Sequence, residues 1–452
     1  MYFKNGYNLQ SFIKSEYLIN HTVTVHKNNR EHFLGKDSKK ADDKEDEITV
    51  ESGECKGIKF APQLIDETSW FPVDERKTMF VFSAFYIKGR KKVFIIGAKQ
   101  MVSAITICQY WYQNESSGEM FVKEKPSTVS MPREGQNKKY TSTIFECGLG
   151  TSRMPSYISV VTKSCETPLN ILRVKNVSKP ERYKNRFAVC LSPLYFNYSR
   201  AYELVEWIEL NRILGAEKFV IYNISTSINV NQVLAYYSKR GLVEVVQWRL
   251  PMRVATYPRS KEPIEIHYFG QTAALNDCLF RSKGDSEYLV NVDLDEFIIP
   301  HGNNLFNWTD TIKPFAEKSN VFLFKSTYFR KEWENNITGL PDKDLIEKLK
   351  LVTLQIYEHE GRIFPARHRS KYIAHTASVD RILIHEVQAA RTEVIPDYIG
   401  LVHHYRNWFN QKDRRGEVKD YTVQQKFGTN LIKRVQNVWN DLVGVKMEIT
   451  SQ

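Results

Sequence analysis

The hydrophobic pattern of this chain is of two kinds, and the change falls near residue 180. Between Phe60 and Val177 the apolar runs are short, and Met79–Ile87 and Lys92–Ala98 flank a turn at Gly89-Arg90. Such runs predict a hairpin within a small β-rich domain. The stretch from Gly118 to Lys139 is rich in Ser, Pro, Lys and Gly, and it predicts a long loop.

After Lys179-Pro180, strand-like runs alternate with helical periodicity. Leu204, Trp207 and Ile208 recur at helical spacing, with Ser199 as a candidate N-cap. We expect strands at 186–191, 218–222, 242–248 and 288–292, and helices at 199–214, 230–240 and 268–281. This alternation predicts an α/β fold with a parallel sheet, helices on its faces and ligands at the carboxyl ends of its strands.

The pattern predicts four segments. Residues 1–59 form a polar, charged N-terminal segment, within which Lys36–Glu54 has the composition of a solvated linker. A β-rich domain follows at 60–180, the α/β domain covers 181–420, and a helical tail covers 421–452.

Composition limits the possible partners. The net charge of +12 suits an anionic partner, but the chain has no basic-aromatic repeat and no Cys/His finger spacing. We therefore expect no nucleic-acid binding and a mildly basic, solvated surface.

The cysteines bear on the cellular compartment. The six cysteines include no C-x-x-C pair, which argues against a cysteine zinc site and is compatible with disulfides in a secretory lumen; Cys190 and Cys278 are equally compatible with buried thiols. Seven N-x-[ST] sequons add modest support. Met1–Asn20 has no apolar core, and the longest apolar runs are too short to cross a bilayer. Membrane association would need an anchor outside this sequence; without one, a cytosolic location is the alternative.

The run Glu287–Pro300 carries the main candidate chemistry, because Asp293, Asp295 and Glu296 interrupt an apolar strand pattern. Mg²⁺ and Mn²⁺ take oxygen ligands, so carboxylates two residues apart at a strand end can hold such an ion against a phosphate. A turn that closes the strand is the alternative. Asp342-Lys343-Asp344 has the same spacing but opens a predicted helix, so we interpret it as a capping cluster.

The segment after the first α/β strand, Ser192–Tyr198, contains no glycine. Close approach of the backbone to phosphates is therefore not expected there. A metal held by Asp293 and Asp295 is the predicted substitute.

A set of motifs recurs in order along the chain: Glu203, Glu206-Trp207, Asn211, Gly215, Tyr222-Asn223, Gln271, Asn276-Asp277-Cys278, Val292–Phe297 and His403–Arg406. Together they resemble glycosyltransferase family 92 over about residues 75–430. The Ser83–Tyr86 hairpin with Arg90 is also similar to the β-rich region that precedes the family's catalytic domain.

The resemblance implies a GT-A fold preceded by a small β-rich domain, an inverting mechanism and a UDP-sugar donor, with UDP-galactose the best represented. Asp293 and Asp295 match the family's Asp-x-Asp motif and would hold Mn²⁺ between the donor phosphates. A later histidine often joins such a metal; His404 and His385 are the candidates, and each is equally compatible with a structural role.

Six residues are candidates for donor binding: Ser192, Tyr222, Asn223, Gln271, Asp277 and Lys371. A polar helix face is the alternative for Gln271 and Asp277, and ordinary surface charge is the alternative for Lys371. The acceptor hydroxyl needs a base, for which Glu332 and Glu334 are candidates in a loop that is equally compatible with solvated acids. Trp333 between them either stacks on a sugar or packs in the loop.

We therefore expect a metal-dependent, inverting transferase that passes a sugar, best galactose, from a UDP-sugar to a glycan acceptor. The implied location is the Golgi lumen, as a type II membrane protein. The alternative is a catalytically inactive glycan- or nucleotide-binding protein of the same fold. A phosphotransferase would need further phosphate-binding groups, and the sequence has no glycine-lysine P-loop motif.

Overall fold

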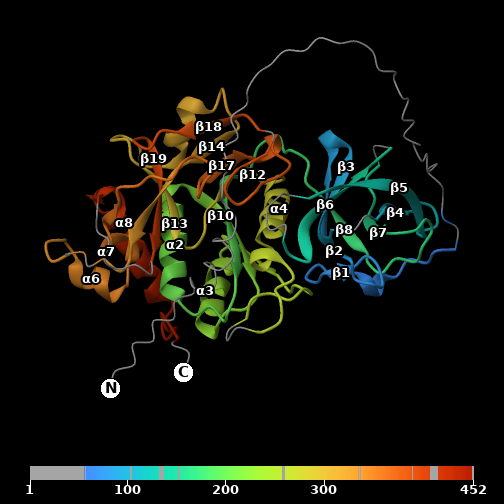
Figure 1. Ribbon diagram of the computed structural model, residues 1–452, viewed down its shortest axis with the longest axis horizontal. Coiled ribbons are helices and arrows are strands. Elements are labelled where there is room, and N and C mark those ends of the chain that lie inside the picture. The colour runs from blue at the N-terminus through green and yellow to red at the C-terminus, as the bar shows by residue number, and fades with distance from the viewer. Residues whose placement is uncertain are drawn as a thin grey trace, which may run out of the picture.

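A computed structural model describes residues 55, 57–101, 104–131, 137–150, 153–256, 260–333, 335, 337–388, 390–407 and 416–449. The predicted linker Lys36–Glu54 and the candidate base Glu334 lie outside the described residues. Figure 1 shows a β-rich part, coloured blue to teal, beside a larger part coloured green to red. No helix in the described ranges is both long and apolar enough to span a membrane.

The β-rich part is one eight-stranded sheet in the order β1-β2-β3-β6-β5-β4-β7-β8, and a further pairing of β2 with β8 closes it. Its strands are β1 (Phe71–Pro72), β2 (Met79–Ile87), β3 (Lys92–Gln100), β4 (Ile107–Gln113), β5 (Met120–Ser130), β6 (Tyr140–Gly148), β7 (Tyr157–Val161) and β8 (Leu172–Asn176), with short 3-10 helices η1 (Pro62–Leu64) and η2 (Lys88–Arg90).

The predicted hairpin is confirmed as β2 and β3. The predicted loop over Gly118–Lys139 is wrong, because β5 occupies its centre and pairs with both β4 and β6. Along β5 buried Val122 and Glu124 alternate with exposed Lys123 and half-buried Lys125, so one face meets solvent and its polar composition hides the strand.

The larger part contains the predicted parallel sheet. Strands β9 (Asn185–Leu194), β10 (Ala216–Asn223), β11 (Val243–Gln247) and β12 (Ser286–Asn291) pair in parallel, in the order β11-β10-β9-β12. Their connections carry α2 (Ala201–Leu214), α3 (Ile228–Lys239), η3 (His267–Gly270) and α4 (Gln271–Ser282). The predicted strands and helices are thus confirmed to within three residues at each end, but Ser199 is not the N-cap: Arg200 holds that position without a side-chain bond.

The sheet continues with strands that the periodicity did not predict as partners. β17 (Lys371–His375) pairs antiparallel with β12, and β14 (Val321–Phe324) and β18 (Thr392–Ile395) follow. A short 3-10 helix, η5 (Thr376–Ser378), follows β17.

A third, five-stranded sheet lies beyond the acidic run. It contains β13 (Glu296–Pro300), β19 (Gly400–Arg406), β15 (Ser326–Arg330), β16 (Glu358–Glu360) and β20 (Glu417–Lys419) in that order. The helices of this region are α5 (Trp308–Ile312), η4 (Lys313–Phe315), α6 (Lys343–Lys348), α7 (Val352–Gln355) and α8 (Thr422–Asp441). Asp342 opens α6 as predicted, although its side chain makes no capping bond. The apolar run Glu287–Pro300 is therefore not one strand, because its two halves belong to different sheets.

Helix α4 joins the two parts of the molecule (Figure 1). Phe280 on this helix stacks on Phe85 and Phe94, with ring centroids 5.6 and 5.1 Å away. The buried Asp277 accepts hydrogen bonds from Ser83 Oγ of β2 (2.5 Å) and Tyr222 Oη of β10 (2.6 Å). The β-rich sheet thus packs directly against the helix that leads into β12.

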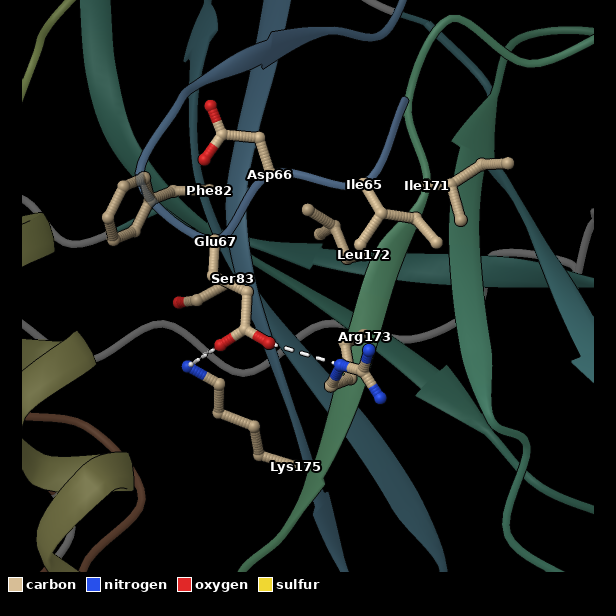
Figure 2. Close-up of a pocket in the computed structure, with 9 residues that line it drawn as sticks. All are labelled: Ile65, Asp66, Glu67, Phe82, Ser83, Ile171, Leu172, Arg173 and Lys175. Atoms are coloured by element: carbon tan, nitrogen blue, oxygen red, sulfur yellow. Dashed lines mark ion pairs between the residues drawn. The ribbon is translucent and has the colours of Figure 1, made fainter. Parts of the chain in front are cut away.

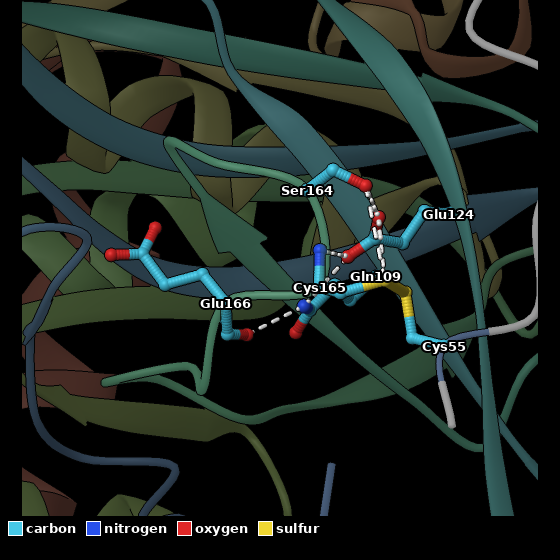
Figure 3. Close-up of a disulfide and its surroundings, with 6 residues drawn as sticks. All are labelled: Cys55, Gln109, Glu124, Ser164, Cys165 and Glu166. Carbon is cyan, nitrogen blue, oxygen red and sulfur yellow. Dashed lines mark hydrogen bonds between the residues drawn. A yellow bond between two sulfur atoms is a disulfide. The ribbon is translucent and has the colours of Figure 1, made fainter. Parts of the chain in front are cut away.

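All six cysteines form disulfides: Cys55–Cys165, Cys108–Cys147 and Cys190–Cys278. The alternative that Cys190 and Cys278 are buried thiols is therefore wrong. Their bond links β9 to α4. At Cys55–Cys165 the carboxylate of Glu124 accepts bonds from the Cys165 amide, Ser164 Oγ and Gln109 Nε2, each at 2.8 Å (Figure 3).

A narrow pocket in the β-rich part contains Ser83 on β2 and Arg173 and Lys175 on β8 (Figure 2). Its one central carboxylate, Glu67, pairs with Arg173 Nε and Lys175 Nζ, each at 3.1 Å. These charges pair with one another, and none of the predicted site residues lines the pocket.

Candidate functional site

The segment between β12 and β13 carries Asp293 and Asp295, and backbone bonds fix its path. The Glu296 amide donates to Asp293 O (3.1 Å), and the Trp207 indole donates to the same oxygen (3.0 Å). The Tyr405 amide of β19 donates to Asp295 O (2.8 Å). Leu294 between the aspartates packs on the core. The two carboxylates are thus presented by a rigid connection between two sheets.

The carboxylate of Asp293 is engaged on both oxygens. Ser192 Oγ, at the end of β9, donates to Oδ1 (2.6 Å), and Gln271 Nε2, at the start of α4, lies 2.6 Å from that hydroxyl and 3.3 Å from Oδ1. Lys371 Nζ, at the start of β17, donates to Oδ2 (2.6 Å). Three predicted donor-site residues therefore meet at Asp293.

Asp295 faces the other sheet. Its Oδ2 lies 3.2 Å from His404 Nε2, and its side chain is 43% exposed. The other ring nitrogen, Nδ1, lies 3.1 Å from Glu296 Oε1, and Glu296 is the cross-strand neighbour of His404 in the β13–β19 ladder. Glu296 Oε1 thus lies beside Nδ1, although no hydrogen bond joins the two atoms, and Nε2 is directed toward Asp295.

Burial and charge act in opposite directions in this cluster. Burial would raise the pKa of Asp293, but the Lys371 charge and the bonds from Lys371 and Ser192 hold that pKa below its usual range. Burial likewise opposes ionisation of Asp295, and His404, Arg406 and Lys331 overcome it to lower its pKa. Both aspartates are therefore ionised at neutral pH.

Burial and neighbouring charges also oppose each other in setting the pKa of Glu296 and of Lys371. Burial raises the pKa of Glu296 although Lys371 and His404 act against it. Burial also disfavours the Lys371 ammonium, yet Asp293 and Glu296, at 2.6 and 3.0 Å, raise its pKa. Lys371 is 0% exposed, so the alternative that it is ordinary surface charge is wrong.

Aromatic side chains cover one edge of the site. Tyr195 stacks on Phe269 with centroids 3.9 Å apart, and its hydroxyl lies 3.2 Å from that of Tyr268. Tyr268, Phe269, Phe196 and Asn197 all have positive φ, between 37° and 58°. Non-glycine residues in the left-handed region cluster at functional sites, because surrounding structure must hold them there.

Two predicted donor-binding residues lie elsewhere. Tyr222 and Asp277 are fully buried and bonded to each other, and they contact α4 and β2 rather than the aspartates. The prediction that Tyr222 and Asp277 bind the donor is therefore corrected. The alternative for Asp277, a polar helix face, is wrong too, because Arg281 Nε pairs with Asp277 at 2.5 Å inside the core. Asn223 follows Tyr222 at the carboxyl end of β10 and accepts from Thr226 Oγ1 (3.3 Å).

The structure also separates the two candidate histidines. His404 contacts Asp295, whereas His385 Nδ1 lies 3.2 Å from Ser370 O. Burial and the charge of Lys371 lower the pKa of His385 to about 4. His404 is therefore the histidine placed to share a metal with Asp295.

Glu332 is one of the two candidate bases for the acceptor hydroxyl. Glu332 pairs with Arg330 Nη1 at 2.9 Å, and its side chain is 9% exposed. Trp333 is buried, as a packed loop aromatic would be. A catalytic role for Glu332 or Glu334 stays a prediction.

Three residues that belong to this charged cluster were not among the predicted site residues. Glu296 was noted only as part of the acidic run, although it contacts both Lys371 and His404. Lys331 pairs with Glu203 Oε1 (3.1 Å), and Arg200 pairs with Glu203 Oε2 (3.2 Å). The family motif Glu203 could have drawn attention to the two basic partners, but nothing in sequence spacing links position 203 to 331.

The parallel sheet with carboxylates at the carboxyl ends of its strands, followed by a second sheet that supplies a histidine, fits the predicted GT-A fold of a glycosyltransferase. The chain belongs to glycosyltransferase family 92, whose model matches residues 185–446. The predicted family and fold class are confirmed.

Two similar relatives are galactosyltransferases by name. Beta-1,4-galactosyltransferase galt-1 of Caenorhabditis elegans is 30% identical over 177 residues, which cover 37% of this chain and 40% of the relative. Galactan beta-1,4-galactosyltransferase GALS1 of Arabidopsis thaliana is 24% identical over 259 residues, covering 52% and 49%. The chain thus spans about half, or less, of these relatives' length.

Among solved structures, TarS of S. aureus in complex with UDP-GlcNAc aligns at 15% identity and a TM-score of 0.26, covering 58% of this chain and 68% of that one. Glucosyl-3-phosphoglycerate synthase of Mycobacterium tuberculosis, in complex with Mn²⁺, UDP and glucosyl-3-phosphoglycerate, aligns at 13% identity and a TM-score of 0.24, covering 58% and 81%.

Proposed function

We propose that this glycosyltransferase transfers galactose from UDP-galactose to a glycan acceptor with inversion, and that it uses a divalent cation held by Asp295 and His404. The observation that carries the proposal is the Asp295 Oδ2 to His404 Nε2 distance of 3.2 Å at an edge where Asp295 is exposed. The galactosyltransferase relatives support the choice of sugar.

The donor set fits a cation such as Mn²⁺. Carboxylate oxygen suits hard divalent ions, and imidazole is a common further ligand. Asp293, whose oxygens accept from Ser192 and Lys371, is a further candidate ligand, because each carboxylate oxygen keeps a second lone pair. Bound there, the cation would offset the charge that develops on the departing diphosphate.

The protein's own residues supply the rest of the donor site. Arg406 and Lys331 lower the pKa of Asp295 and add positive charge where an anionic diphosphate would lie. Ser192 lies near the carboxyl end of β9, and Gln271 lies at the start of α4. Ligands bind at such positions in open α/β sheets. Tyr195 and Tyr268 offer ring faces and hydroxyls for a nucleoside or sugar.

The test is UDP release. The full chain is incubated with UDP-galactose or other UDP-sugars, Mn²⁺ and a galactosylated or fucosylated glycan, using wild type and Asp295→Ala. Asp441→Ala, at the exposed end of α8, is the matched control because Asp441 pairs only with surface groups on α3. We expect release from wild type and Asp441→Ala and a loss with Asp295→Ala; the anomeric configuration of the product, read by NMR, tests inversion.

Equal release from all three proteins would refute the catalytic assignment. Binding of a glycan or UDP without any transfer would favour the inactive binding protein instead.

We further propose residence in the Golgi lumen as a type II membrane protein, with the anchor supplied outside this sequence. The three disulfides support it, because disulfides persist in oxidising compartments. Colocalisation with Golgi markers and glycosidase-sensitive mobility of the natural protein test this; a cytosolic pool with reduced cysteines would contradict it.

A further inference from the structure

Three metal-binding side chains converge outside the donor site. His301 directly follows β13, His403 lies on β19, and Asp420 lies between β20 and α8. The two histidine Nε2 atoms are 2.7 Å apart, and Asp420 Oδ2 is 3.3 Å from His403 Nε2 and 3.5 Å from His301 Nε2. Within the described residues, this is the one group of His, Cys, Asp or Glu atoms at such short mutual distances that does not include a disulfide.

The cluster is separate from the aspartates of the donor site. His403 and His404 are adjacent on a strand, and neighbouring strand residues point to opposite faces. His404 faces Asp295, and His403 faces Asp420. The two groups therefore lie on opposite faces of β19.

We propose that His301, His403 and Asp420 form a zinc site with three protein ligands. Two imidazole nitrogens and one carboxylate oxygen are a usual zinc donor set. A tetrahedral zinc ion with ligands about 2.0–2.1 Å away separates them by about 3.3 Å. The two histidine–aspartate distances match this value, and the two nitrogens need to part by about half an ångström.

Neighbouring groups hold each ligand in place. Asp420 Oδ1 accepts the Thr422 amide (2.8 Å) in the first turn of α8, which leaves Oδ2 for the histidines. The His403 ring stacks on Phe329 with centroids 4.2 Å apart. Lys426 Nζ donates to the carbonyl of His301 (3.2 Å) and to three nearby carbonyls. Such supporting contacts are usual around metal ligands.

A hydrogen-bonded cluster without metal is the competing explanation. If one Nε2 carries a proton, that N–H can donate well either to the other Nε2 or to Asp420 Oδ2, but not to both. The remaining short distance then brings two lone pairs together. An ion satisfies all three lone pairs together. His301 is 18% exposed, so solvent reaches the edge of the cluster.

The site would attach α8 to the antiparallel pair of strands β13 and β19. Because these strands also carry Glu296 and His404, zinc binding would stiffen the strands behind the donor site. The expected role is structural support, and the inference does not depend on the proposed transferase activity.

The zinc content of the protein tests the inference. The Asp295→Ala substitution is present in every protein, so that the proposed donor-site cation does not contribute. The full-length Asp295→Ala protein is loaded with zinc, dialysed against metal-free buffer and measured by mass spectrometry. The second protein carries Asp420→Asn in addition, and its amide oxygen can still accept from Thr422. The third carries Asp397→Asn, a matched change at a partly exposed aspartate that pairs with Lys325 at 3.6 Å.

We expect one zinc ion per chain in the Asp295→Ala protein and in the Asp397→Asn control, with loss of zinc and of the zinc-induced rise in Tm in the Asp420→Asn protein. Equal zinc in all three, or none in any, would overturn the site. If Asp420→Asn fails to fold, X-ray absorption of the zinc-loaded Asp295→Ala protein decides: a shell with two imidazoles supports the site, and a shell without them refutes it.

Discussion

Lys371 lies between two carboxylates, with its Nζ 2.6 Å from Asp293 Oδ2 and 3.0 Å from Glu296 Oε2, and none of its side chain reaches solvent. One buried ammonium thus balances an aspartate that faces the parallel sheet and a glutamate that supports His404. Because removing one partner of a buried ion pair leaves the other charge without compensation, this contact controls both the stability and the charge state of the site.

Replacing this lysine should be costly. We expect Lys371→Met to lower the free energy of unfolding by about 3–5 kcal/mol, because Asp293 and Glu296 would lose their buried countercharge. Denaturant unfolding measures the change. Lys325→Met, in a partly exposed pair with Asp397, is the matched control and should change stability by less than about 1 kcal/mol; similar losses in both variants would contradict the prediction.

Glu296 should act on the cation through His404. We expect Glu296→Gln to raise the Mn²⁺ concentration needed for half-maximal UDP release by about 10–100-fold, because it weakens the group that orients the imidazole. Saturating Mn²⁺ should restore most of the rate. A lowered rate with an unchanged Mn²⁺ requirement would show that Glu296 does not act through the metal.

His404 and His385 should differ in their effect on Mn²⁺-dependent donor binding. We expect His404→Ala to abolish the Mn²⁺ dependence of donor binding, measured by calorimetry with UDP, whereas His385→Ala should retain it. The reason is that His404 Nε2 faces Asp295 while His385 contacts the Ser370 carbonyl. The reverse result would assign the metal to His385.

Glu206 should give the protein a specific pH dependence. Its carboxylate accepts bonds from the Val352 and Thr353 amides (2.9 and 2.8 Å), yet burial raises its pKa to about 7 from an ordinary value of 4.5. The folded state then binds more protons than the unfolded state between these pH values, so this contribution to stability is full below pH 4.5 and is lost as the pH rises to about 7.

Comparison with Glu206→Gln isolates that contribution. From pH 4.5 to 7 the unfolding free energy of wild type should fall relative to the variant by up to about 3 kcal/mol, since one pKa unit corresponds to about 1.4 kcal/mol. Denaturant titrations at several pH values measure it. Parallel pH profiles for the two proteins would show that Glu206 is ionised throughout.

The Cys190–Cys278 disulfide should affect the site more than the others do. Cys190 lies two residues before Ser192, and Cys278 lies on the helix that begins with Gln271. We expect the double replacement by alanine to destabilise the fold by about 2–5 kcal/mol and to weaken UDP binding. Replacing Cys55 and Cys165 is the control, with a stability loss but unchanged UDP binding; equal effects on UDP binding would contradict the link.

The sequence predicted the first four strands of the parallel sheet and their helices because both faces of that sheet are covered, which gives long apolar runs and clear helical periods. It missed β5, whose solvent-facing positions are polar, and it predicted no separate strand at β13, where the apolar run resumes after the acidic residues. Strand pairing between distant segments, such as β13 with β19, is set by tertiary packing.

The same limit applied to the site. Ser192 and Asp293 directly follow predicted strands and Gln271 lies in the first turn of a predicted helix, so the sequence could place these three at one edge of the sheet. Tyr222 stands at a strand end too, but its ring turns to the opposite face, and sequence gives no sign of which face is covered by the β-rich sheet. The cluster of His301, His403 and Asp420 joins positions more than a hundred residues apart, which no spacing rule detects.

The chain leaves the parallel sheet at Asn291 and enters the third sheet at Glu296. Asp293 is therefore attached to one sheet through Ser192 and Lys371, and Asp295 to the other through His404 and the Tyr405 amide. Residues 292–295 are therefore the connection between the two sheets. A sliding of one sheet against the other would change the spacing of the two carboxylates, so a ligand bound across them would oppose any such movement.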